Sequence, residues 1–247
     1  MNEASWRIGD VPVRAAGGSV TGDHYDANYD RFHLDPSSPL AVVADGMGSG
    51  EGSAAAGRLA VETVVHAAGA EGRTPAAMRA ATAEAHVRVR EKARDLRELT
   101  GCTLTALAGV PGSDGGATAR IAQLGDSRVY RLRGGLLELL TVDHTWAWLA
   151  AVHGWWAADS AEARAARYRL TRYVGHPDEP EPDVLDVTLR TGDTLLLCTD
   201  GVSDQLSYDE IAAALAPRNP VTAVSALLAA TLTAGGADNA TAIVLVV

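Results

Sequence analysis

Four aspartates stand at points where apolar stretches of this chain end or begin. Asp45 ends the run LAVVAD, and Asp200 ends the run LLLCTD in the same way. Asp126 lies in the turn sequence GDSR, and Asp238 opens the last apolar stretch, DNATAIVLV. Carboxylates at the ends of buried strands are well placed to converge in one cleft, so their positions indicate a shared acidic site.

The chemistry of this acidic set favours a magnesium or manganese site. Carboxylate oxygens are hard ligands, and no His or Cys cluster lies near them in the sequence, so Mg²⁺ or Mn²⁺ fits better than Zn²⁺. Gly46, directly after Asp45, has no Cβ and would let its backbone carbonyl approach a cation closely. A single Asp-Gly pair more often only makes a turn, so the prediction depends on the four positions together.

Composition limits the classes of partner and compartment. The 247 residues carry 31 acidic and 21 Lys or Arg side chains, a net charge of −10, and 47% of them are hydrophobic. This balance is typical of a globular protein, and the acidic excess argues against a nucleic acid or an anionic membrane as partner. The two cysteines give no disulfide framework, the first residues do not resemble a secretory signal, and no apolar run is long enough to span a bilayer. We therefore expect a cytoplasmic protein.

Helices are expected on both sides of the strands that carry the aspartates. They cover 53–70, 75–94, 208–214 and 221–233, and the stretch 144–169 is also Ala-rich and helical in pattern. Ser53 is the expected N-cap of the first helix. Thr74 and Pro75 place a cap and a first-turn proline at the start of the second.

Short apolar runs bounded by turn residues predict the strands. They cover 39–44, 103–107, 117–124, 129–132, 136–140, 184–189, 194–198 and 241–247. The sequences GDS (125–127) and GG (134–135) look like two hairpin turns between strands. Two helices, several strands, two helices and a final strand suggest helices packed outside an antiparallel sandwich. Because no linker or repeat interrupts the chain, we expect one domain over 1–247.

Six longer stretches follow one another in a fixed order between Gly22 and Val246. They are VVADGMGSG (42–50), GCTLTAL (101–107), QLGDSRVYRLRGG with LLELLTVDHT (123–145), LTRYVG (170–175), GDTLLLCTDGVSDQL (192–206) and DNATAIVL (238–245). In this order they resemble the metal-dependent Ser/Thr protein phosphatase family (type 2C, PPM), in its bacterial branch. The resemblance implies an α+β fold, a four-layer αββα sandwich of two antiparallel sheets flanked by helix pairs.

The resemblance also implies a metal site with two or three Mn²⁺ or Mg²⁺ ions at the ends of the sheets. Catalysis would depend on Asp45, Asp200 and Asp238 through a metal-bound water. The implied metal ligands are Asp45, the carbonyl of Gly46, Asp126, Asp200, Asp204 and Asp238, with Asp126 and Asp204 at a weaker additional ion, and the supporting residues are Asn28, Asp30 and Asn239. The implied reaction is phosphomonoester hydrolysis by in-line attack of a water that bridges two cations, without a covalent enzyme intermediate.

The first motif of the family, Arg-x-x-Asn-Glu-Asp, is altered in this chain. Tyr25 stands in place of the arginine that grips the substrate phosphate, and Tyr29 in place of the glutamate that binds the second metal. A neutral phenol supplies neither a cationic fork nor an anionic ligand at neutral pH. The local replacements open to the chain are Asp23 or Asp26 for the metal and His24 or Arg31 for the phosphate, so the candidates for substrate binding are His24, Tyr25 and Arg31.

The stretch 144–169 corresponds to a small flap beside the active site in this family. Four of the five tryptophans of the chain lie in it: Trp146, Trp148, Trp155 and Trp156. They are either the core of a small helical subdomain or an exposed aromatic surface for a substrate or partner. Both interpretations stay open from the sequence.

Three functions are compatible with these residues. The favoured one is a phosphoserine and phosphothreonine protein phosphatase, whose partner is a phosphorylated protein. The altered phosphate grip and the Trp-rich flap motivate a second, a phosphatase of a small phosphorylated metabolite. The loss of the second-metal glutamate motivates a third, a pseudophosphatase that binds a phosphoprotein as a regulator. The retained aspartates count against the third, because buried like charges are costly without a cation.

Overall fold

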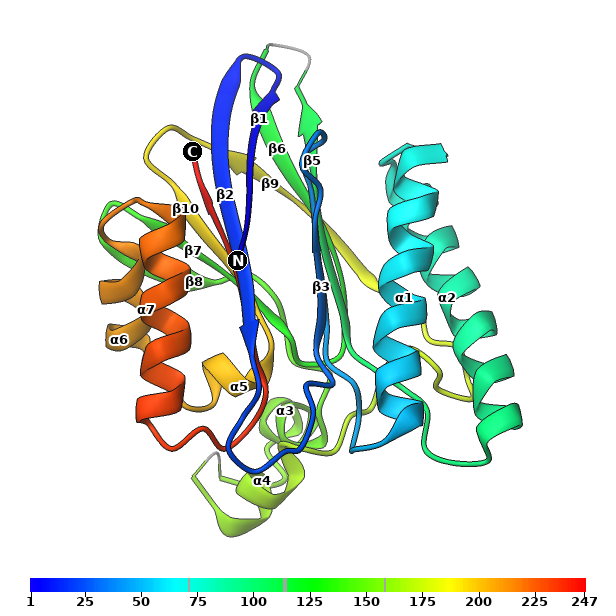
Figure 1. Cartoon of the computed structure of the whole chain (residues 1–247). Helices are drawn as coiled ribbons and strands as arrows, with labels where there is room; N and C mark the ends of the chain where they lie inside the picture. Colours follow the sequence, from blue (N-terminus) through cyan, green and yellow to red (C-terminus); the bar gives the residue numbers. More distant parts are fainter. Residues whose placement is uncertain (71, 113–114, 158) are drawn as a thin grey trace.

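Two antiparallel sheets lie face to face in the computed structural model, which describes residues 1–70, 72–112, 115–157 and 159–247 (Figure 1). In these residues the first sheet has the strand order β1 (Asn2–Ile8), β2 (Val11–Val20), β11 (Ala240–Val246), β10 (Thr194–Cys198), β7 (Arg128–Arg133) and β8 (Leu136–Leu139). The second has the order β3 (Arg31–Leu34), β4 (Leu40–Ala44), β5 (Leu104–Pro111), β6 (Ala117–Leu124) and β9 (Asp183–Leu189). The expected antiparallel sandwich is confirmed.

Helix pairs cover the two outer faces, which gives the four expected layers (Figure 1). The pair α1 (Glu51–Ala70) and α2 (Pro75–Leu96) packs on the second sheet, and the pair α6 (Tyr208–Leu215) and α7 (Pro220–Thr233) packs on the first. The described residues also form α3 (Trp146–His153), α4 (Ala161–Ala166) and α5 (Asp200–Ser203). Within the described ranges, no helix combines the length and the apolar character needed to cross a membrane.

The central strands are apolar on both faces because each sheet is covered on both sides. On β4, Val43 packs between the sheets while Val42 packs against α1 and α2, and both are fully buried. On β11, Ile243 and Val244 divide in the same way between the inner core and the layer under α7. This double burial explains why these strands read as continuous apolar runs rather than as alternating patterns.

The starts of the first two helices differ in how well the sequence predicted them. The Thr74 hydroxyl accepts a hydrogen bond from the backbone N–H of Ala77 at 3.1 Å, so the predicted cap of α2 is confirmed. The predicted cap of α1 is wrong, because α1 begins at Glu51 and Ser53 lies inside its first turn. The Ser53 hydroxyl is buried and donates to the carbonyl of Met47 instead, which fixes the loop that follows β4.

The prediction of a hairpin at 125–127 is also wrong. Strand β6 belongs to the second sheet and β7 to the first, so this turn carries the chain from one sheet to the other. The turn at 134–135 is a hairpin as predicted, since Arg133 pairs with Leu136 across β7 and β8. Apolar runs locate strands but do not say which sheet the next strand joins. The crossover places Asp126 where the two sheets end together.

Strands β1, β2 and β3 were not predicted from the sequence. In β1 only alternate residues are buried, such as Trp6 and Ile8, and charged side chains interrupt the pattern. In β2 the buried face is partly glycine, and a Cβ on Gly17 would lie 3.1 Å from the Phe32 ring. Small residues at a close contact between sheets leave no apolar run for a sequence pattern to detect.

Candidate metal centre

A cleft of about 620 Å³ collects the predicted acidic residues. Its lining includes all five aspartates proposed as metal ligands, namely Asp45, Asp126, Asp200, Asp204 and Asp238, together with Gly46, Asn239 and Tyr25. Asp45 follows β4, Asp200 follows β10 and Asp238 precedes β11, so strands of both sheets bring them together. The convergence predicted from strand ends is therefore present in the fold.

Thr103 links Asp45 to the turn that carries Asp126. The backbone N–H of Asp45 donates to the Thr103 hydroxyl at 2.9 Å, and the N–H of Thr103 donates to the carbonyl of Asp45 at 2.9 Å. The same hydroxyl lies 2.7 Å from the hydroxyl of Ser127. These bonds fix the backbone on either side of the cleft, so the two carboxylates are held by main-chain geometry rather than by their own side chains.

Asp30 joins the two strands of the first sheet that hold Asp200 and Asp238. One of its carboxylate oxygens accepts hydrogen bonds from the hydroxyls of Thr199 at 2.8 Å and Thr241 at 2.6 Å. Asp30 is buried and does not line the cleft, so it acts on the site through Thr199 and Thr241. A supporting role for Asp30 stays a prediction.

The other two residues expected to support the site, Asn28 and Asn239, each accept a hydrogen bond from a backbone N–H. The side-chain carbonyl of Asn28 accepts from the N–H of Asp30 at 3.0 Å, and its amide donates to the Ser19 hydroxyl at 2.7 Å. The side-chain carbonyl of Asn239 accepts from the N–H of Gly22 at 3.2 Å. Asn28 therefore orients Asp30, and Asn239 fixes the loop beside Asp238.

Close backbone contacts set the spacing between the segments that carry the aspartates of the cleft. A Cβ on Gly201, the residue after Asp200, would lie 2.0 Å from the carbonyl oxygen of Asn239. A Cβ on Gly22 would lie 2.4 Å from the carbonyl oxygen of Asp238. Any larger residue at either position would have to push the backbone segments of the site apart.

Gly201→Ala is therefore expected to lower the free energy of unfolding by about 1–3 kcal/mol, the usual cost of overpacking against backbone. Urea unfolding followed by circular dichroism measures the change. Gly69→Ala is the matched control, because a Cβ on Gly69 in α1 meets nothing within 4 Å. This substitution only replaces a glycine, which disfavours a helix, so it should not lower the free energy of unfolding. Equal unfolding curves for the wild type and Gly201→Ala would show that this contact does not set the spacing.

Burial makes the acidic cluster electrostatically costly without a counter-charge. Burial raises the pKa of Asp30 to about 8 and that of Asp200 to about 6. Burial, with added repulsion from neighbouring carboxylates, raises the pKa values of Asp45 and Asp126 well above their ordinary value. In the part of the chain that the structure describes, one buried oxygen each of Asp30 and Asp200 has no hydrogen-bond partner. Each of these features is relieved by a nearby cation.

The donor set fits Mn²⁺ or Mg²⁺ but does not by itself complete a coordination sphere. Carboxylate and carbonyl oxygens are the ligands these ions prefer, and Mg²⁺ usually keeps several waters. Among the described residues, no three His, Cys, Asp or Glu side chains are grouped closely enough to hold a metal ion alone. Backbone carbonyl and water ligands would have to supplement the aspartates, which is the role expected for the carbonyl of Gly46.

The candidates for substrate binding lie in different places. Tyr25 lines the cleft, and burial together with the charges of Asp238 and Asp45 raises its pKa. Burial also raises the pKa of Asp238, and the backbone N–H of Asn239 and the nearby Tyr25 hydroxyl oppose that effect. His24 is exposed and does not line the cleft. Arg31 is also absent from the lining, and its guanidinium donates to the carbonyls of Asn28 and Asp30 at 2.8 and 2.7 Å.

The flap between 144 and 169 contains α3 and α4 and lies beside the sheet ends (Figure 1). Its tryptophans do not form a buried core, since Trp148 is 45% and Trp155 is 55% exposed. Its two ends lie together. Thr145 and Leu170 form an isolated bridge, and the N–H of Trp146 donates to the carbonyl of Arg169 at 2.9 Å.

A second recess of about 430 Å³ lies between the flap and the sheets. Sequence reasoning assigned no role to its basic residues, which are Arg128, Arg164 and Arg167. Arg128 belongs to the GDSR stretch, so its place near Asp126 could have been inferred. Arg164 and Arg167 lie in the flap, where nothing in the sequence shows which way the helix faces.

The comparisons with known proteins agree with this geometry. A model of the family described as protein phosphatase 2C matches residues 18–235. The serine/threonine protein phosphatase PstP of Mycobacterium tuberculosis is 30% identical over 239 residues, which cover 94% of this chain and 44% of PstP. This chain therefore spans less than half the length of that relative.

Two solved structures show the same fold. PppA, a regulatory component of the T6SS in Pseudomonas aeruginosa, superposes with a TM-score of 0.82 at 31% identity, over 99% of both chains. The catalytic domain of PstP in complex with two manganese ions superposes with a TM-score of 0.81 at 28% identity, over 94% of this chain and 97% of that one.

Proposed function

Because the chain belongs to the protein phosphatase 2C family, we propose that it hydrolyses phosphoserine and phosphothreonine in proteins with the help of Mn²⁺ or Mg²⁺. The observation that carries the proposal is the single cleft in which five aspartates from both sheets converge. The relatives named above support the same activity, since PstP is a serine/threonine protein phosphatase whose catalytic domain binds two manganese ions.

The residues that would hold two cations are Asp45, Asp200, Asp238 and the carbonyl of Gly46. Divalent cations at this position would activate a water for in-line attack on phosphorus and offset the charge of the phosphoryl oxygens. The chain's own part is to hold the carboxylates in place, through Thr103 at Asp45 and through Asp30 and Thr199 at Asp200. Asp126 and Asp204 line the side of the cleft that faces the flap.

The cleft binds phosphate without a basic side chain of its own. None of the described residues that line it is Lys, Arg or His, and Tyr25 occupies the position of the family's phosphate-gripping arginine. A phenol can offer the phosphate one neutral hydrogen bond but no charge. The cations would therefore supply most of the attraction for the phosphoryl group, and we expect binding to depend strongly on metal concentration.

Phosphate release with Mn²⁺ tests the function and separates the substrate classes. We expect turnover of p-nitrophenyl phosphate and of phosphoserine and phosphothreonine peptides, with higher kcat/KM for the peptides than for phosphorylated sugars or nucleotides. A preference for one small phosphorylated metabolite would favour the second candidate function, since the loss of the arginine changes how the substrate is held. If the protein shows no turnover over a wide range of Mn²⁺ concentrations but still binds phosphopeptides, the result would favour the third candidate function, a pseudophosphatase.

The organisation and compartment are also part of the proposal. We take residues 1–247 as one phosphatase domain with a small Trp-rich flap subdomain at about 144–169, and we place its action in the cytoplasm on a phosphorylated protein. The two cysteines, Cys102 and Cys198, are free and buried, which is compatible with a reducing compartment.

A further inference from the structure

The recess beside the flap shares one wall with the metal cleft. Asp126, Asp200 and Asp204 line both spaces, so a cation bound near Asp126 and Asp204 would face the recess. The opposite wall is the flap, which contributes Arg164 and Arg167. Whether the flap offsets the negative charge of the shared wall therefore depends on which groups these two arginines contact.

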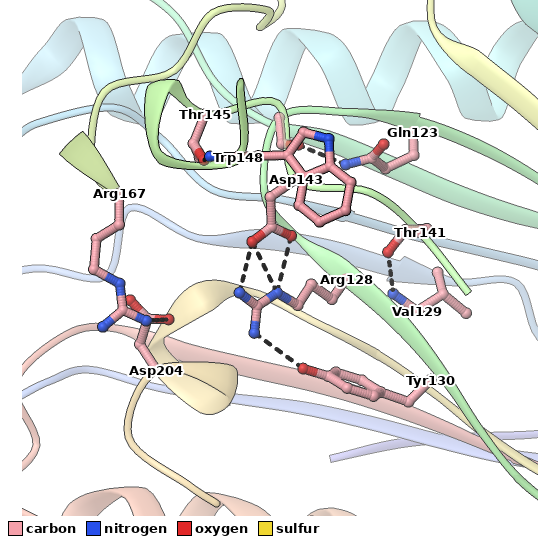
Figure 2. Close-up of polar contacts among 11 residues, drawn as sticks. Gln123, Arg128, Val129, Tyr130, Thr141, Asp143, Thr145, Trp148, Arg167 and Asp204 are labelled. Atoms are coloured by element: carbon pink, nitrogen blue, oxygen red, sulfur yellow. Dashed lines mark hydrogen bonds and ion pairs between the residues drawn. The ribbon is translucent and has the colours of Figure 1, made fainter. Parts of the chain in front are cut away.

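Arg167 is bound to a carboxylate of the cleft. Its guanidinium lies 2.7 Å from a carboxylate oxygen of Asp204, and Figure 2 shows the two side chains in contact. Asp204 is only 18% exposed, whereas Arg167 is 41% exposed. Burial raises the pKa of Asp204, and the positive charges of Arg167 and Arg128 oppose that effect. Arg167 thus already supplies Asp204 with a positive charge.

The other two arginines of the recess have different partners. Arg128 forms a two-pronged ion pair with Asp143, at 2.9 and 2.6 Å, and donates to the Tyr130 hydroxyl at 3.1 Å (Figure 2). Arg164 donates to the carbonyl of Asp159 within the flap. Among the described arginines that line the recess, Arg167 is the one that contacts a carboxylate of the cleft.

Arg167 also has a contact with an aromatic ring. It directly follows α4, and its guanidinium lies 5.7 Å from the centre of the Tyr168 ring, which lines the metal cleft. An arginine placed over an aromatic face gains a further electrostatic contact. A divalent cation at Asp204 would have to displace this guanidinium or bind beside it against charge repulsion.

We propose that Arg167 takes the place of a third metal ion, so that the cleft binds two divalent cations while the flap closes the wall formed by Asp126 and Asp204. This inference rests on the proposed function, because it concerns the same cleft. It differs from the expectation that Asp126 and Asp204 ligate an additional ion. In this chain the flap itself would carry the positive charge, so the position of the flap and the number of bound metals would be linked.

The test counts Mn²⁺ ions without using activity. Isothermal titration and the electron paramagnetic resonance signal of free Mn²⁺ give the number of sites and their affinities for the purified full chain. We expect two sites in the wild type and one further site in Arg167→Gln, with an affinity at least about tenfold above any weak third binding in the wild type, since a unit positive charge beside the site is gone. Adding Asp204→Asn to Arg167→Gln should remove the further site.

Two control variants separate charge from general disturbance of the flap. Arg164→Gln removes an arginine of α4 that lines the same recess but does not contact Asp204, and this variant should bind two ions like the wild type. Arg167→Lys keeps a positive charge, so this variant should also bind two Mn²⁺ ions. Thermal melting of each variant establishes that it folds, and the half-exposed position of Arg167 makes its replacement tolerable.

Each outcome decides either the inference or the function it rests on. A third site in the wild type as tight as that of Arg167→Gln, equal titrations for the wild type and Arg167→Gln, or the same gain in Arg164→Gln would each overturn the role of Arg167. A wild type that binds no Mn²⁺ would overturn the proposed function instead. In that case a gain of one ion in Arg167→Gln would still support the role of Arg167, and no gain would still overturn it.

Discussion

Asp200→Asn is expected to lower Mn²⁺-dependent phosphate release by about a thousandfold or more. Asp200 lies where the cleft meets the recess, and one of its carboxylate oxygens is buried without a hydrogen-bond partner among the described residues. Asparagine keeps the shape of the side chain but removes its negative charge, so a cation loses a ligand while the fold keeps its packing. Initial rates with p-nitrophenyl phosphate over a range of Mn²⁺ concentrations measure the effect.

Asp209→Asn is the matched control for this experiment. Asp209 is exposed in the first turn of α6 and does not line the cleft, so the same chemical change should leave the rate unaltered. Raising the Mn²⁺ concentration should not restore the Asp200→Asn rate to that of the control. Comparable rates in the two variants would contradict the assignment of Asp200 as a metal ligand.

Saturating Mn²⁺ is expected to raise the Tm by about 5–10 °C, and more at about pH 8 than at about pH 6. The sign follows from the carboxyls of the cluster. Burial raises the pKa of Asp200 to about 6 and of Asp30 to about 8 in the fold, above the unfolded value of about 4. Between the unfolded pKa of about 4 and the folded values of about 6 and about 8, the metal-free fold therefore holds more protons than the unfolded chain. Its free energy of unfolding falls as the pH rises through this range.

Cations act in the opposite direction, because they favour the ionised carboxylates. Their stabilising effect should therefore grow as protons leave the cluster. Differential scanning calorimetry at both pH values, with and without Mn²⁺, gives the shifts, and KCl at matched ionic strength controls for general screening. Asp200→Asn should lose most of the Mn²⁺ shift, whereas Asp209→Asn should keep it. A shift that is absent, or smaller at the higher pH, would count against a buried carboxylate site.

The sequence predicted the part of the site that depends on strand ends. Asp45, Asp200 and Asp238 adjoin strands buried on both faces, and such strands appear as unbroken apolar runs whose ends are easy to locate. In two antiparallel sheets packed face to face, carboxylates at those strand ends are expected to lie close together at one edge. The turn sequence GDSR gave Asp126 and motif order added Asp204, and both residues line the cleft.

The features of the site that the sequence did not predict depend on contacts between distant segments, and no local sequence pattern indicates such contacts. The crossover at Asp126 required knowing which sheet β7 joins. The support from Asp30 depends on Thr199 and Thr241, which lie 169 and 211 positions further along the chain. The pairing of Arg167 with Asp204 depends on how a short helix of the flap is turned. Sequence periodicity gives the existence of such a helix more readily than its orientation.

The bridge between Thr145 and Leu170 makes the flap a closed insertion. Its chain leaves the sandwich and returns at one point, and the strands that carry Asp45, Asp200 and Asp238 lie outside it. A segment whose ends already touch can change in length or composition with little strain on its surroundings. The flap could therefore be exchanged for another on an unchanged set of strands, as long as its replacement still places a positive charge beside Asp204.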